Sequence, residues 1–222
     1  TVTGLATQTT YYWWVKAVCN EQSSSVWSDV NSFTTMCELK TAGEMGVEDF
    51  ESYTNNKQPG GCWIVGNKQS TASSYIPTVK TTTSTPPIKG LYFQSVVSST
   101  AANGTYAIMP QIKVDSISRL RIKFSIGTTS ATYVAPQYAH SLTVGVITDP
   151  KDLSTFTAVE TVDAPSAMTN LEVRFDKYKG DADGKFGKYV MFLSEFDKDN
   201  RVYIDDISFD TIPECVSPTV VI

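Results

Sequence analysis

Short runs of alternating apolar and polar side chains are the feature that most constrains how this chain can fold. In SRLRIKFSI, residues 118–126, the apolar side chains share one parity and the polar ones share the other: Leu120, Ile122, Phe124 and Ile126 against Arg119, Arg121, Lys123 and Ser125. Successive side chains of a β-strand point to opposite faces. This run therefore predicts a half-buried strand of an antiparallel sheet.

Several other stretches repeat this pattern and indicate an all-β fold. Strand-like runs occupy residues 140–148, 155–162, 171–178 and 187–194. Turn-forming residues separate the runs, for example TDPKD at 148–152, KGDADG at 179–184 and DKDN at 197–200. Since no helix-length pattern lies between them, we expect a β-sandwich or jelly roll.

Composition excludes several classes of protein. The 222 residues are 41% hydrophobic and 11% aromatic, which is enough for a full core. The net charge of −5 argues against a nucleic-acid partner, for which a basic stripe is expected. No run approaches the roughly 18 apolar residues of a membrane span. The four cysteines form no C-x-x-C pair and there is one histidine, so a structural zinc site is not expected. An even number of cysteines in a threonine-rich chain is consistent with export to an oxidising compartment.

The first 36 residues resemble the end of a fibronectin type III domain. GLATQTTYYWWVKAVC, residues 4–19, is similar to the penultimate strand of that family, with Tyr11 as the tyrosine-corner residue. SSSVWSDVNSFTT, residues 23–35, is similar to its last hairpin and strand. A complete domain has seven strands in about 100 residues, so we expect a fragment, or a second chain that supplies the missing strands. Residues 214–222 are predicted to be a linker and the start of a following module.

Residues 37–213 resemble the MAM domain and, more closely, the jelly-roll cleaved-adhesin modules of secreted Bacteroidetes proteins. The resemblance rests on DFE at 49–51, CW at 62–63 and IDDISFDTIPEC at 204–215. It is supported by AIMPQI at 107–112 and LTVGVITDPKDLSTFTAVETV at 142–162. The resemblance implies a non-catalytic, secreted or cell-surface adhesion module.

Acidic residues among apolar neighbours single out the closing stretch VYIDDISF, residues 202–209. Strict alternation would place Asp205 with Tyr203 and Ile207, and Asp206 with Val202 and Ile204, so each face would bury an acid. A buried, unpaired carboxylate is costly unless it is protonated, paired or metal-bound.

The early segment supplies Glu48, Asp49 and Glu51, and the first and last strands of a jelly roll are commonly neighbours. Calcium would satisfy such converging acids, because it takes about six to eight oxygen ligands. The family resemblance implies a structural calcium between Glu51 and Asp205, with Asp49 and Asp206 as further contributors. The alternative is that Asp205 accepts backbone hydrogen bonds while Glu51 and Asp206 are solvated.

The cysteines leave three connectivities open. Cys37, Cys62 and Cys215 lie in or beside the central domain, and Cys19 lies outside it. The MAM resemblance implies a bond between Cys37 and Cys62. A bond between Cys37 and Cys215 would be natural if the two ends of the domain lie side by side, and free thiols are also open.

Ligand-binding candidates come from the loop TTSATYVAPQYAH, residues 128–140. Its Tyr133 and Tyr138, together with Arg121 on a neighbouring polar face, could contact a glycan or a protein; alternatively the tyrosines pack over the end of the sandwich. His140 has no triad partners in a nucleophile-elbow setting, and no phosphate-binding glycine loop occurs. We therefore expect no enzyme.

Three functions remain open for such a chain. The leading hypothesis is an adhesion or binding module whose partner is a glycan or protein on a host or cell surface, next to other domains of the same polypeptide. The alternatives are a carbohydrate-binding module appended to a hydrolase and a purely structural spacer. The fold alone does not choose among them.

Overall fold

Two units make up the chain, Thr1–Glu38 and Leu39–Ile222, and each is described by itself. The structure is a computed structural model. It describes residues 2–20, 22–68, 75–84, 86–95, 104–128, 140–194 and 200–213. Within these ranges no helix has the length and apolar character needed to cross a membrane.

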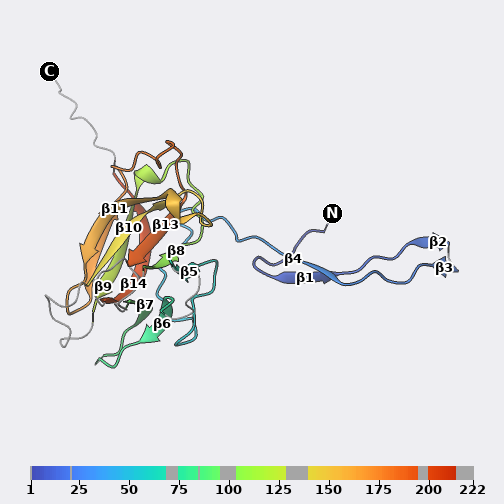
Figure 1. Cartoon of the computed structure of the whole chain (residues 1–222), viewed down its shortest axis with the longest axis horizontal. Helices are drawn as coiled ribbons and strands as arrows, with labels where there is room; N and C mark the ends of the chain where they lie inside the picture. The colour runs from blue at the N-terminus through green and yellow to red at the C-terminus, as the bar shows by residue number, and fades with distance from the viewer. Residues whose placement is uncertain are drawn as a thin grey trace, which may run out of the picture. The chain divides into compact units, whose positions relative to one another are not determined.

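The first unit consists of two-stranded ribbons (Figure 1). Strand β1 (Thr10–Trp13) pairs antiparallel with β4 (Asn31–Thr34), and β2 (Val18–Asn20) pairs with β3 (Ser23–Ser24). The Tyr11 ring stacks on Phe33 with ring centroids 5.9 Å apart. None of the described side chains of residues 2–38 is buried.

The second unit is a sandwich of two five-stranded antiparallel sheets (Figure 1). Sheet I has, in spatial order, β11 (Phe156–Asp163), β10 (Ser141–Ile147), β13 (Tyr189–Ser194), β8 (Thr105–Ile108) and β5 (Ile64–Asn67). Sheet II has β12 (Thr169–Arg174), β9 (Leu120–Gly127), β14 (Asn200–Thr211), β7 (Lys89–Ser95) and β6 (Thr78–Thr81). Two short 3-10 helices, Ile117–Arg119 and Leu153–Thr155, precede β9 and β11. The chain crosses repeatedly between the sheets, which confirms the predicted all-β jelly roll.

The core lies between the two sheets and follows the predicted alternation in β9. Leu120, Ile122, Phe124 and Ile126 are all at most 3% exposed. Phe124 meets Phe192 of sheet I edge to face, with ring centroids 5.4 Å apart. Full burial of each such side chain stabilises the fold by about 1.5–3 kcal/mol, so this interleaving accounts for much of the stability of the unit.

The prediction of strict alternation in β14 is wrong because the strand contains a bulge. Its register against β9 shifts between Asp205 and Ser208. Ile204 pairs with the inward-facing Ile126 before the bulge, whereas Phe209 pairs with the inward-facing Ile122 after it. The bulge thus keeps apolar side chains on the core side and leaves Asp205, opposite Ser125, on the outer face.

Candidate cation site and polar groove

The early acidic segment lies directly against the bulge of β14. The Glu48 N–H donates to the Ile207 carbonyl at 2.8 Å, and the Ile207 N–H donates to the Glu48 carbonyl at 2.9 Å. This two-hydrogen-bond bridge confirms that the early segment and the closing strand are neighbours. It brings the acids of residues 48–51 to the same part of the module as Asp205 and Asp206.

Glu48 organises this segment, a role that sequence reasoning did not find. Its carboxylate accepts hydrogen bonds from the Phe50 N–H at 3.1 Å, the Tyr53 hydroxyl at 3.0 Å and the Trp63 Nε1–H at 3.4 Å. The rings of Tyr53 and Trp63 both pack on buried Phe50, which itself has a positive φ of 53°. Burial, together with the Glu48 charge, raises the pKa of Tyr53. In the sequence, the one sign of this role of Glu48 was that it adds a further acid directly before the D-F-E motif.

Asp205 is half-buried on the outer face of sheet II. One of its oxygens, Oδ1, accepts the Asp206 N–H at 2.9 Å, and Asp206 has a positive φ of 51° at the bulge. On β7, Gly90 leaves room for this turn, because a Cβ there would lie 2.6 Å from the Ile204 carbonyl oxygen. Burial raises the pKa of Asp205 to about 7, and the charges of Asp206, Glu51 and Asp49 act in the same direction.

The four predicted metal ligands therefore share one neighbourhood without forming a closed cluster. Asp49 accepts the Glu51 N–H at 3.1 Å, and the Glu51 carbonyl accepts from the Lys89 ammonium at 2.7 Å. Among the described residues, no ion pair neutralises Asp205. Also within that part of the chain, no group of three or more His, Cys, Asp or Glu side chains is gathered closely enough to hold a metal ion. The arrangement is a local excess of negative charge around one half-buried carboxylate.

Arg121, a predicted ligand contact, is held in an ion-pair network on the outer face of sheet II. Its guanidinium lies 3.1 Å from Glu172 and 2.7 Å from Asp210, and Lys123 lies 3.0 Å from the same Asp210 oxygen. Hydrogen bonds from Arg121 and Lys123 lower the pKa of Asp210 to about 2. The role of Arg121 toward a ligand stays a prediction, and Tyr133 and Tyr138 lie outside the described residues.

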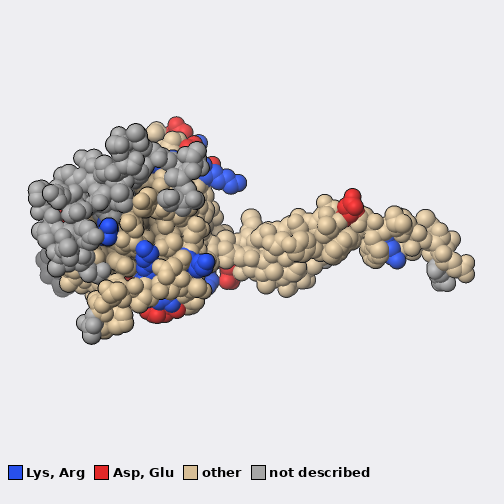
Figure 2. All heavy atoms as spheres, turned by 60° about the horizontal axis from the view of Figure 1, so that its bottom comes forward, with Lys and Arg blue, Asp and Glu red and all other residues tan. Residues whose placement is uncertain are grey.

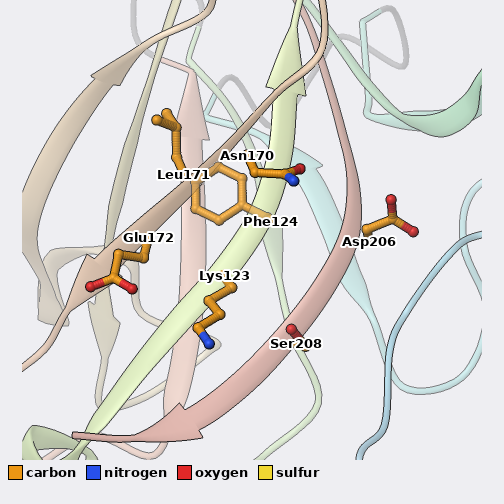
Figure 3. A pocket seen from close by; sticks show the side chains of 7 residues that line it. All are labelled: Lys123, Phe124, Asn170, Leu171, Glu172, Asp206 and Ser208. Carbon is orange, nitrogen blue, oxygen red and sulfur yellow. The ribbon is translucent and has the colours of Figure 1, made fainter.

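A polar groove lies beside this network, across β12, β9 and β14 (Figure 3). Its volume is about 400 Å³, and its lining residues are Lys123, Phe124, Asn170, Leu171, Glu172, Asp206 and Ser208. In Figure 3 the Asn170 amide extends across β9 toward β14, with Lys123 and Ser208 below it and Glu172 to one side. The bulge helps to form the groove, since Asp206 and Ser208 belong to the bulged part of β14.

The structure gives the oxidation state of three of the four cysteines. Cys37 and Cys62 are both disulfide-bonded, so free thiols at these two positions are excluded. Cys19 is free and exposed, so the expectation that it could take part in a disulfide is wrong. Cys215 lies outside the described residues, and the pairing stays a prediction.

Comparison with known proteins supports the fold. No protein-family model and no curated protein sequence matches the chain. Among solved structures, the K2 cleaved adhesin domain of Lys-gingipain is similar over 74% of this chain and 97% of that domain, with 15% identity and a TM-score of 0.50. The K1 cleaved adhesin domain of Lys-gingipain from Porphyromonas gingivalis W83 covers 75% of this chain and 98% of that domain, with 16% identity and a TM-score of 0.51.

A family 11 carbohydrate-binding module of a Clostridium thermocellum cellulase aligns less well, with 14% identity and a TM-score of 0.44 over 76% of this chain and 94% of the module. At these identities the likeness to the two adhesin domains concerns the fold. The chain thus has the cleaved-adhesin-type jelly roll that its motifs predicted.

Proposed function

We propose that residues 37–213 form a non-catalytic, extracellular adhesion or binding module of a multi-domain protein. The observation that carries the proposal is the match to two cleaved adhesin domains over 97% and 98% of their lengths. The disulfide-bonded Cys37 and Cys62 agree with an oxidising, extracellular compartment. The expected partner is a glycan or a protein on a host or cell surface.

A binding assay tests this proposal against the spacer alternative. The chain is immobilised and screened against a glycan array and against a panel of extracellular host proteins. An adhesion module retains at least one class of partner, and its binding is lost when the chain is heat-denatured. If neither panel is retained, the module is a spacer.

The proposal includes a structural calcium at the candidate cation site. The donor chemistry suits a hard cation, because the acids of residues 48–51 lie in the same part of the module as Asp205, which has no ion-pair partner among the described residues. Since these carboxylates form no closed cluster, the ion would have to draw them together. Glu51 and Asp205 would hold the ion, with Asp49 and Asp206 contributing. A bound calcium would supply positive charge between the early segment and the bulge, and it would stabilise the native state by binding that state alone.

Thermal unfolding with calcium and with chelator tests the metal. Calcium is expected to raise the melting temperature by several degrees, whereas magnesium, which demands a smaller octahedral site, should raise it less. In Asp205→Asn the calcium effect should disappear. The matched control Asp163→Asn, at the exposed end of β11, should keep it. A wild-type midpoint that is the same with calcium and chelator would reject the metal.

The first unit is proposed to be the closing part of a fibronectin type III domain. Its support is the Tyr11 hydroxyl, which accepts the Ala6 N–H at 2.8 Å, as a tyrosine-corner hydroxyl bonds to the backbone upstream. The pairing of β1 with β4 agrees with the last two strands of such a domain. Adding the remaining fibronectin strands upstream should slow hydrogen exchange in β1 and β4, and unchanged exchange would contradict the proposal.

A further inference from the structure

The groove lies on the outer face of sheet II, over the edge strand β12 and the inner strands β9 and β14. A peptide that adds to a sheet pairs with the backbone of an edge strand. A ligand on the face of the sheet instead meets the side chains that line the groove, and the volume of about 400 Å³ lies within the usual range of ligand sites.

The polar side chains of the groove are held in place before any ligand arrives. Ion pairs with Arg121 and Asp210 fix Glu172 and Lys123. The Asn170 Oδ1 accepts the Ser125 hydroxyl at 2.6 Å, and no hydrogen bond within the described residues uses its Nδ2. The Asn170 amide can thus donate to a ligand without rearranging, which lowers the entropic cost of binding.

The charges around the groove nearly cancel. Two cations, Arg121 and Lys123, face two anions, Glu172 and Asp210, in one connected network. Lys123 is the one cation in the described lining of the groove, and it is already paired with Asp210. An anionic ligand would have to compete with Asp210 for this cation, whereas a neutral ligand leaves the network intact.

The groove also lacks the features that anchor a protein partner. Phe124 is 2% exposed and faces the core, so no aromatic side chain is offered, and Leu171 is the single half-buried apolar side chain in the lining. Protein interfaces depend on apolar or aromatic anchors that fill pockets. The lining instead offers both hydrogen-bond donors and acceptors. This combination suits the hydroxyl groups of a ligand, because each hydroxyl both donates and accepts.

We propose that this groove binds a neutral saccharide through its hydroxyl groups. The Asn170 amide and the Lys123 ammonium donate, the Glu172 carboxylate accepts, and the Ser208 hydroxyl does both. This inference rests on the proposed binding function and gives it a ligand class and a location. It places the ligand on the sheet, and the role of the loop residues Tyr133 and Tyr138 stays a prediction.

The test uses the whole chain labelled with nitrogen-15 and titrated with defined probes. The neutral probes are cellotetraose, laminaritetraose, xylotetraose and mannotetraose, and the anionic probe is tetragalacturonate. Backbone signals and the Asn170 side-chain amide signal report the location of binding, once in calcium and once in chelator. Asn170→Ala is compared with the matched control Thr161→Ala, on an exposed position of β11, and melting curves check that both variants fold.

At least one neutral tetrasaccharide should shift signals of residues 123, 170–172 and 206–208, and Asn170→Ala should weaken its binding about tenfold. Thr161→Ala should bind as the wild type does. The groove would be rejected as the saccharide site by binding that shifts the signals of other surfaces, by a preference for tetragalacturonate, or by unchanged binding in Asn170→Ala. Any of these results would still leave the chain a binding module. If no neutral probe binds, the saccharide assignment is rejected, and the glycan and protein panels then decide the proposed function separately.

Discussion

The ribbon of residues 1–38 and the jelly roll of residues 39–213 carry the same kind of alternating, aromatic-rich sequence, yet they treat their apolar side chains differently. In the jelly roll, Phe124 and Phe192 are at most 2% exposed. In the ribbon, Phe33, Trp14 and Trp27 are 44%, 51% and 61% exposed. Figure 2 shows few charged side chains on the visible face of the ribbon, and the sequence has only four in residues 1–38. Alternation predicts which side chains share a face, but a second layer is needed to bury them.

Strand pairing by itself does not replace that second layer. The ribbon has backbone ladders of the same antiparallel type as the jelly roll. However, an isolated two-stranded ribbon is marginally stable at best in water, because it buries too little apolar surface to offset its conformational entropy. Matched substitutions, one in each region, therefore measure what the second layer contributes.

The largest expected difference comes from removing one phenylalanine ring in each region. Phe192→Ala should lower the free energy of unfolding of the jelly roll by about 3–5 kcal/mol, since it leaves a cavity in the core. Phe33→Ala should change it by less than about 0.5 kcal/mol, because Phe33 is exposed. Urea denaturation followed by circular dichroism measures both. Equal losses would mean that the ribbon contributes to the same core.

A smaller contrast concerns the side chain that anchors the backbone in each region. Glu48→Ala should cost about 1–3 kcal/mol, because it leaves the Tyr53 hydroxyl, the Trp63 indole N–H and the Phe50 N–H without their acceptor. Tyr11→Phe should cost less than about 0.5 kcal/mol, since its hydrogen bond to Ala6 is exposed. Urea midpoints of the two variants decide, and a Glu48→Ala midpoint equal to that of the wild type would refute the anchoring role.

The next effect is a pH dependence of the jelly roll that the ribbon should lack. The pKa of Asp205 is raised from 3.8 to about 7, so the folded state holds its proton more tightly than the unfolded state. In chelator, stability should therefore fall as the pH rises from about 4 to about 7, by roughly 1 kcal/mol once solvent screening of this half-exposed group is allowed for.

Urea midpoints across this pH range measure the effect in three chains. Asp205→Asn should abolish the fall, and Asp29→Asn in the ribbon should leave it unchanged. A fall that persists in Asp205→Asn would assign the titration to another group.

The smallest effect belongs to the exposed network around Asp210. Hydrogen bonds from Arg121 and Lys123 lower the pKa of Asp210 to about 2, so its stabilising contribution is present above its ordinary pKa and is lost as the pH falls toward 2. A carbon-13 titration of the carboxyl group should show this low pKa in the wild type. In Arg121→Ala it should move toward 3.8, and an unmoved value would leave Lys123 as the sufficient cause.

Much of the fold could be read from local pattern. The alternation in residues 118–126 gave both the strand β9 and its buried face, and the polar turn at residues 181–184 forms where its residues indicated. The pairing of the early acidic segment with the closing strand followed from the expectation that the first and last strands of a jelly roll are neighbours, and it is confirmed by the Glu48–Ile207 bridge. The parts that could not be read were the bulge in β14 and the role of Glu48. Both depend on partners distant in the sequence.

The sequence by itself determined the all-β class and the presence of acidic residues, Asp205 among them, in an otherwise apolar closing strand. Strand parity and charge can be read from neighbouring residues alone. The tertiary structure alone decided which face Asp205 occupies, which donors surround Glu48 and which three strands build the groove. The physical reason is that a one-residue bulge reverses the parity of everything after it. Where the bulge falls is set by packing across two sheets, and no local pattern encodes that packing.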